Sequence, residues 1–219
     1  MDQYTQPDYG KIALLTIDVQ NDFSLPGAIM EVKGTSAVIP NIVKLLQCFR
    51  EQNQPIIHIV RLYKADGSNA DISRRQKIED GLRAAVPGSE GAELVNAIKP
   101  HDQKLDAALL LNNGIQDLSH SEHVIYKSRW GAFYNTYLYD FLNKMGIKTL
   151  VFTGCNFPNC PRTSIYEASE RDFKLIIITD AISGIYEKGI EEMKNVGCEV
   201  ITAQEFIDIC SVQRAEKIG

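Results

Sequence analysis

The chain alternates between short apolar runs and longer segments with helical periodicity. The apolar runs are rich in valine, isoleucine and leucine and are continuously apolar, which is typical of strands buried on both faces of a parallel sheet. They predict strands at 11–18, 54–61, 123–127, 148–154, 174–180 and 198–203.

Hydrophobic residues between these runs recur at the spacing of a helix. Segment 35–52 has one apolar stripe, formed by Val38, Ile42, Leu45, Leu46 and Phe49. A similar stripe in 135–145 ends before Gly146, a residue suited to stop a helix. Two further helices are expected at 161–172 and 186–196.

Alternating strands and helices predict the fold class. We expect a three-layer α/β sandwich with a mostly parallel, Rossmann-like sheet of about six strands. The chain reads as a single domain, 1–219, with its core at about 10–212. The polar stretch 64–75 predicts a long loop or a lid.

Charge and composition limit the classes of partner and the compartment that we expect for this protein. The net charge is −5, and no run of five like charges occurs, so neither nucleic acid nor an anionic membrane surface is an expected partner. The first ten residues lack the basic and apolar regions of a signal peptide. Five cysteines, an odd number, favour free thiols in a reducing compartment. We therefore expect a cytoplasmic protein.

Charged residues follow two of the predicted strands. Asp18 stands at the end of the first strand, where it could belong to a functional site or only cap the turn that follows. Asp22 could fill the capping role equally well. Lys127 ends the run "HVIYK" and, taken alone, reads as a solvated rim residue. Because ligands of parallel sheets bind beyond the carboxyl ends of the strands, the two side chains would pair if both faced that crevice.

The loop "TGCNFPNCPR" carries a candidate nucleophile. Pro161 suits the first position of a helix, which places Cys160 at the N-cap of helix 161–172. The partial positive charge of a helix start, or a nearby ammonium, would lower the pKa of this thiol. A Cys155–Cys160 disulfide is not expected in a reducing compartment, and the spacing is not that of a C-x-x-C motif.

The remaining histidines and cysteines predict no metal or cofactor site. His58 lies inside an apolar strand run and reads as a core residue. The sequence also has no glycine-rich phosphate loop and no G-x-S-x-G elbow. The other histidines lie away from predicted strand ends, and the other cysteines fall in apolar patterns: His101, His120, His123, Cys48, Cys198 and Cys210.

Three segments, in order, carry a resemblance to a known family. "LLTIDVQNDF", "YKSRWGAFYNTYL" and "LVFTGCNFPNCPRTSIYEASERDFKLIIITDAIS" resemble the motif regions of the isochorismatase-like cysteine hydrolases, which include nicotinamidases, N-carbamoylsarcosine amidases and ureidoacrylate amidohydrolases. The resemblance spans about residues 10–204. It implies the isochorismatase-like hydrolase fold, a homodimer or homotetramer, and a catalytic triad of Asp18, Lys127 and Cys160.

The same resemblance implies a mechanism. Asp18 would take the thiol proton, Lys127 would hold the charges in place, and Cys160 would attack the carbonyl carbon of a small amide to form a thioester. Backbone N–H groups of Asn156 and Cys160 would bind the oxyanion. The resemblance also implies a cis peptide between Cys155 and Asn156.

The sequence departs from the family pattern in two places, and these differences limit the choice of substrate. Nicotinamidases carry an Asp-x-His-x-x-His metal site after the second strand, where this chain reads "HIVRLYKADGSN", so neither a metal nor nicotinamide is expected. Phe157 and Pro158 replace small residues in the nucleophile loop. Phe23 and Trp130 lie beside the motif residues and could be aromatic walls of the pocket or ordinary core residues. Arg162 could contact an anionic substrate or be a solvated charge.

We therefore expect a metal-independent cysteine amidohydrolase acting on a small amide, ureide or carbamoyl compound. One alternative is an isochorismatase-type enol-ether hydrolase, a branch that typically lacks cysteine at the nucleophile position. Two others are a non-catalytic binding protein and a thiol redox sensor that uses Cys155 and Cys160.

Overall fold

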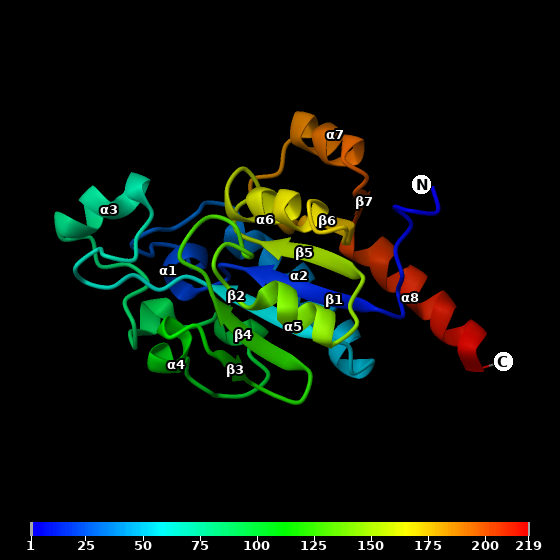
Figure 1. Cartoon of the computed structure of the whole chain (residues 1–219), viewed down its shortest axis with the longest axis horizontal. Helices are drawn as coiled ribbons and strands as arrows, with labels where there is room; N and C mark the ends of the chain where they lie inside the picture. Colours follow the sequence, from blue (N-terminus) through cyan, green and yellow to red (C-terminus); the bar gives the residue numbers. More distant parts are fainter. Residues whose placement is uncertain (1, 219) are drawn as a thin grey trace.

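The sheet is the centre of the molecule. The structure is a computed structural model that describes residues 2–218, with the side chains of 2–213. Within these residues the strands form one seven-stranded sheet of order β3-β4-β2-β1-β5-β6-β7, parallel except for β3, which pairs antiparallel with β4 (Figure 1). The strands are β1 (Ile12–Ile17), β2 (Ile56–Val60), β3 (Ile115–Asp117), β4 (Glu122–Tyr126), β5 (Thr149–Gly154), β6 (Lys174–Ile182) and β7 (Glu199–Ile201).

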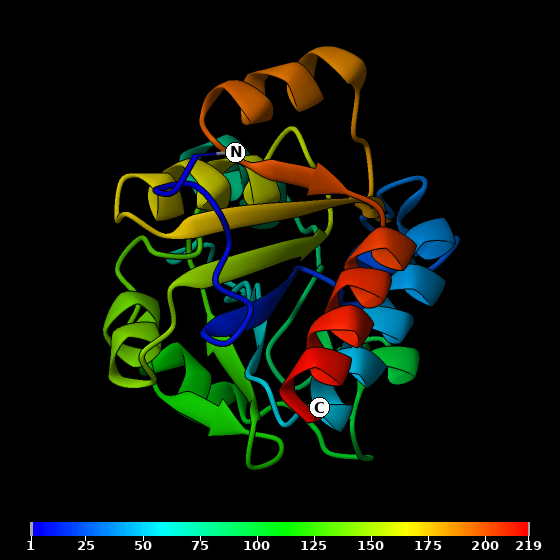
Figure 2. The ribbon, with the colours of Figure 1, turned by 90° about the vertical axis from the view of Figure 1, so that its right-hand side faces the viewer.

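Helices cover both faces of the sheet. Helices α2 (Thr35–Glu51) and α8 (Ala203–Ile218) lie side by side on one face, and α5 (Leu138–Lys144) and α6 (Cys160–Ser169) cover the other (Figure 2). Helix α7 (Glu187–Asn195) packs near β7. The short elements are α1 (Asn21–Ser24), α3 (Ile72–Glu79), η1 (Glu90–Ala92), η2 (Asn96–Ile98) and α4 (Ala107–Leu111).

Two hydrophobic cores explain why the strand sequences are continuously apolar. Ile12 and Leu14 of β1 pack into the core under α2 and α8, whereas Ala13 and Leu15 pack into the core under α5 and α6. Successive side chains of a strand point to opposite faces, so a strand covered on both faces must be apolar at every position. The predicted three-layer α/β sandwich is confirmed.

The structure corrects the expected elements in three places. Segment 64–75 is not a loop throughout, because α3 begins at Ile72. The edge strand β3 and the C-terminal helix α8 were not expected. Strand β3 has only three residues, and half of the residues of α3 are charged, so neither β3 nor α3 gives a clear periodic signal.

His58 is a core residue, as its position in an apolar run indicated. Its Nδ1 lies 2.7 Å from Thr16 Oγ1, and its Nε2 lies 2.7 Å from Glu122 Oε1. Glu122 also accepts from Arg50 at 2.7 Å. Burial alone raises the pKa of Glu122, but the hydrogen bonds from His58 and Arg50 outweigh it and hold this pKa at about 2. Both ring nitrogens of His58 are therefore used inside the core.

Candidate active site

Four neighbouring strands end at one edge of the sheet, and each delivers a reactive or charged group. In sheet order they are β4, β2, β1 and β5. Lys127 follows β4, Arg61 follows β2, Asp18 follows β1, and the loop after β5 leads to Cys160. Because the carboxyl ends of parallel strands share one edge, these residues, which are far apart in sequence, meet at that edge of the sheet.

Asp18 and Lys127 form a buried ion pair. Lys127 is fully buried and Asp18 is 5% exposed. Lys127 Nζ donates to Asp18 Oδ2 at 2.8 Å and to the carbonyl of Arg129 at 3.3 Å. Asp18 Oδ1 is buried and has no hydrogen-bond partner among the described residues. Lys127 is thus not the solvated rim residue that its position alone indicated, but forms the conditional pair with Asp18. One carboxylate oxygen is left available to accept a proton.

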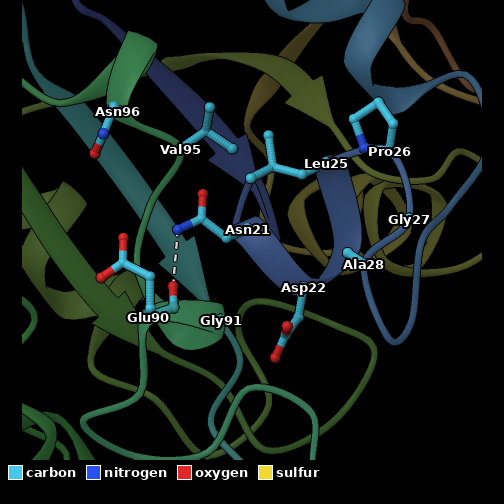
Figure 3. Close-up of a pocket in the computed structure, with 10 residues that line it drawn as sticks. All are labelled: Asn21, Asp22, Leu25, Pro26, Gly27, Ala28, Glu90, Gly91, Val95 and Asn96. Carbon is cyan, nitrogen blue, oxygen red and sulfur yellow. Dashed lines mark hydrogen bonds between the residues drawn. The ribbon is translucent and has the colours of Figure 1, made fainter.

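Asp22, the other acid of the first motif, has a structural role. Its Oδ2 accepts from the Ala85 backbone at 2.7 Å, and the neighbouring Asn21 donates to the carbonyl of Glu90 at 2.7 Å. These bonds attach α1 to the loop around η1 beside a surface cavity of about 470 Å³, where Figure 3 shows Asn21 and Glu90 facing each other. Neither Cys160 nor Lys127 lines this cavity.

Cys160 begins helix α6 at the end of the nucleophile loop. The helix starts at Cys160 with Asn159 as its N-cap, so the expected placement of Cys160 at the N-cap is wrong by one residue. The peptide between Cys155 and Asn156 is cis, as the family resemblance implied. Gly154 has a φ of 113°, and a Cβ there would lie 2.2 Å from the Ile17 carbonyl oxygen. Only glycine lets the end of β5 approach β1 so closely.

Backbone N–H groups of this loop are available beside the thiol. Cys155 donates to the Ile17 carbonyl at 2.8 Å, Phe157 to Ser183 at 2.8 Å, and Asn159 to Asn156 at 3.0 Å. No acceptor within residues 2–218 takes the N–H of Asn156 or of Cys160. Unpaired N–H groups next to a nucleophile are the donors that an oxyanion hole requires.

The protonation state of Cys160 differs from the sequence expectation. The side chain is 4% exposed. Burial raises the pKa of the Cys160 thiol and the Asp18 charge raises it further, while Lys127 and Arg61 lower it. The net shift is upward, so the expected low pKa is wrong. The position at a helix start does not compensate for removal from water, and the resting thiol is neutral at pH 7.

This shift predicts the pH dependence of alkylation. The thiolate is the reactive form, so a raised pKa moves the half-maximal rate of iodoacetamide labelling to a pH above that of a free thiol, about 8.5. Labelling of Cys160, followed by mass spectrometry of its peptide, should therefore be slow at pH 7 and rise only above pH 8.5. The urea-unfolded protein is the control and should show the ordinary midpoint. A folded-state midpoint below 7.5 contradicts the prediction.

Arg61 is a site residue that the sequence reasoning did not single out. It is 1% exposed, and its Nη2 lies 3.8 Å from Cys160 Sγ. Its Nη1 donates to Asp71 Oδ2 at 3.0 Å and to the carbonyl of Ser128 at 3.0 Å. A signal existed in the sequence: Arg61 follows an apolar strand, as Asp18 and Lys127 do.

The candidate pocket residues have different surroundings. Trp130 packs with Arg61, whose guanidinium carbon lies 5.8 Å from the ring centroid. Phe23 is buried in the core under α2. Arg162 is paired with Glu192 and Tyr186, on and beside α7. Trp130 thus contacts Arg61, whose Nη2 lies 3.8 Å from Cys160 Sγ.

Cys155 and Cys160 are both free thiols. Cys155 is 3% exposed, and burial raises the pKa of its thiol to about 12. Oxidation to a disulfide proceeds through a thiolate, and both thiols are neutral at pH 7. The redox-sensor alternative therefore has little chemical support.

The described residues do not fit a nicotinamidase metal site. Among them, no group of three or more histidine, cysteine, aspartate or glutamate side chains could hold a metal ion. The segment after β2, where the resemblance to nicotinamidases would place the ligands, begins with the cationic Arg61. A buried guanidinium at this point opposes a second cation.

A three-layer α/β sandwich with a buried cysteine, carboxylate and ammonium at the carboxyl edge of its sheet has the layout of a hydrolase. The family model of the isochorismatase domain matches residues 12–107 and 110–205, so the chain belongs to the isochorismatase family. It is a hydrolase of this family, whose members include amidohydrolases.

Individual relatives agree with this assignment. A protein of Arabidopsis thaliana named "probable inactive nicotinamidase" is 30% identical over 200 residues, which cover 89% of this chain and 93% of the relative. An N-carbamoylsarcosine amidase of Arthrobacter is 26% identical, covering 84% of this chain and 65% of the relative. The crystal structure of an isochorismatase family protein from Desulfovibrio vulgaris is 31% identical, covers 92% of this chain and 98% of its own, and has a TM-score of 0.77.

The helices of the described part of the chain give no membrane span, since none combines the length and the apolar character that a bilayer crossing requires.

Proposed function

We propose that the protein is a cysteine amidohydrolase that cleaves the C–N bond of a small amide, ureide or carbamoyl compound. The observation that carries this proposal is the placement of Asp18. Lys127 holds Asp18 Oδ2 at 2.8 Å, and Oδ1 is buried without a hydrogen-bond partner in the described part of the chain, beside a thiol whose pKa the Asp18 charge raises. A neutral thiol next to a free carboxylate oxygen is arranged for proton transfer at the moment of attack.

The first half-reaction forms a thioester. Asp18 Oδ1 takes the proton of Cys160 as the sulfur attacks the amide carbon, and the carbonyl oxygen becomes an oxyanion. The N–H groups of Asn156 and Cys160 donate hydrogen bonds to this oxyanion. Lys127 stays charged and keeps Asp18 in place. Asp18 then returns its proton to the leaving nitrogen, the C–N bond breaks, and the amine or ammonia departs.

The second half-reaction releases the acid. A water molecule takes the place of the amine, and Asp18 removes a proton from it as its oxygen attacks the thioester carbon. The C–S bond breaks, and Asp18 returns the proton to the sulfur. Each half-reaction uses Asp18 once as base and once as acid, so the chemistry requires no histidine.

The competing functions differ in what they require of Cys160. An enol-ether hydrolase needs no covalent intermediate. A binding protein needs no reaction at all, and the relative named as a probable inactive nicotinamidase makes this possibility worth testing directly. A complete Asp18–Lys127 pair beside Cys160 supports catalysis, because a buried charge pair is costly to keep where binding alone is needed.

The test is a panel of small primary amides, ureides and N-carbamoyl compounds. Ammonia release is measured for the native protein and for Cys160→Ala, and mass spectrometry of acid-quenched samples detects an acyl group on Cys160. We expect at least one compound to be hydrolysed, the activity to disappear in Cys160→Ala, and the acyl adduct to map to Cys160. Turnover that survives in Cys160→Ala, or no turnover of any compound, would count against the proposal.

A further inference from the structure

One buried cation beside the thiol has no part in the proton transfers described above. Arg61 follows β2, and its Nη2 lies 3.8 Å from Cys160 Sγ. Nearby negative charges raise the pKa of Arg61 further, although burial opposes this, so the guanidinium stays charged. A buried charge that the chemistry does not use requires another explanation.

The structure fixes Arg61 from two sides. Gln20 clamps its backbone: Gln20 Oε1 accepts from the Arg61 N–H at 2.7 Å, and Gln20 Nε2 donates to the Arg61 carbonyl at 2.8 Å. The side chain is held by Asp71 and by the carbonyls of Ser128 and Arg129, the last at 2.7 Å from Nη2. The guanidinium is therefore pre-organised, which lowers the entropic cost of binding a ligand to it.

One edge of this guanidinium is not fully used. The Nε–H of Arg61 is buried and has no hydrogen-bond partner among the described residues. Nη2, which shares an edge with Nε, has only the weak sulfur acceptor of Cys160 besides the Arg129 carbonyl. An edge with two adjacent N–H groups matches the two oxygens of a carboxylate, and a buried unpaired donor is unfavourable until such a partner arrives.

A second cation, Arg74, packs against Trp130, the residue that also packs against Arg61. Arg74 of α3 stacks on Trp130 at 4.5 Å and donates to the Tyr63 hydroxyl at 2.6 Å. Within residues 2–213 Arg74 forms no salt bridge, and the one carboxylate bonded to Arg61 is Asp71. The side chains around Arg61 thus carry excess positive charge in a chain whose net charge is −5. Such a site attracts an anion.

We propose that Arg61 determines the specificity of the site by binding a carboxylate on the substrate, so that the substrate is a small amide with a carboxylate at its other end. This inference rests on the proposed function. The reacting carbon approaches the sulfur to about 3 to 3.5 Å. Since Nη2 lies 3.8 Å from the same sulfur, only a short spacer, on the order of one to three carbons, fits between the amide and the carboxylate.

The experiment measures binding without turnover. In Cys160→Ala, calorimetric titration compares malonamate, succinamate and glutaramate with propanamide, butanamide and pentanamide, which carry a methyl group in place of the carboxylate. We expect at least one carboxylate compound to bind 10-fold or more tightly than its neutral partner. This preference should disappear in Cys160→Ala/Arg61→Gln.

Two further variants keep the result interpretable. Arg61→Gln leaves Asp71 buried without its partner, so Arg61→Gln/Asp71→Asn is measured as well, in the same Cys160→Ala background and with circular dichroism to show that the protein is folded. Arg75→Gln removes an equal charge from an exposed position next to Arg74 and should retain the preference. Equal binding of charged and neutral amides, or a preference that survives loss of Arg61, would overturn the inference.

Binding and hydrolysis separate the two proposals. If carboxylate amides bind through Arg61 and the native protein hydrolyses none of the amides in either set, the proposed function fails and the anion site remains. If neutral amides are hydrolysed as well as charged ones, and Arg61→Gln/Asp71→Asn keeps the same ratio of kcat/KM values, the role of Arg61 is wrong and the amidohydrolase stands.

Discussion

Replacing Asp18 by asparagine is expected to reduce amide hydrolysis by roughly 10³- to 10⁴-fold, the upper part of the range for loss of a general acid–base group. Asparagine keeps the shape of the side chain and still offers one oxygen to Lys127, but it can no longer accept the thiol proton. Because the resting thiol of Cys160 is neutral, no preformed thiolate can substitute for the missing base. The loss should appear in kcat, measured by ammonia release.

The same variant should make the thiol easier to ionise. The negative charge of Asp18 raises the pKa of Cys160, whereas Lys127 and Arg61 lower it. Removing Asp18 leaves the two cations, so the midpoint of iodoacetamide labelling should move to lower pH as hydrolysis falls. A purely structural role for Asp18 predicts no such opposite change. If activity and alkylation fall together, or if activity persists, Asp18 is not the base.

Replacing Lys127 by methionine is expected to lower the free energy of unfolding by about 3 kcal/mol or more. Methionine fills a similar volume, but the substitution leaves the Asp18 carboxylate, 5% exposed, without the ammonium that neutralises it at 2.8 Å. Breaking a buried ion pair from one side typically costs about 3 to 5 kcal/mol. Urea unfolding of the two proteins measures the difference.

A double substitution distinguishes loss of charge balance from loss of packing. Asp18→Asn/Lys127→Met removes both charges and should recover most of the stability that Lys127→Met loses, since a buried pair contributes little net stability. Both proteins should remain inactive. If the double variant is no more stable than Lys127→Met, the cost arises from packing around the methionine, and the electrostatic explanation is wrong.

The architecture could be predicted from the sequence because it depends on residue patterns that repeat along the chain. Strands covered on both faces are apolar throughout, and all six expected strands are present with shifts of at most two residues at their ends. The antiparallel strand β3 and helix α3 could not be predicted in the same way, since their positions depend on contacts with other elements. Local propensity says little about such short, polar segments.

The candidate site was predicted in part. Asp18 and Lys127 were expected to pair if both faced the carboxyl edge of the sheet, and the family resemblance implied a triad of these two residues with Cys160. The pKa of Cys160 could not be predicted, because it depends on how deeply the finished fold buries the thiol. Arg61 was missed because its importance lies in an unpaired Nε–H and in a contact across 99 residues of sequence.

The arrangement of one functional side chain per strand end bears on how such a protein can diversify. Lys127, Arg61 and Asp18 follow separate strands, and each strand is held by its own buried apolar residues. A substitution at the end of β2 can therefore change which compound is accepted, while the strands that deliver the nucleophile and the base keep their packing. New specificities can then arise by single replacements, with the chemical step inherited unchanged from the ancestor.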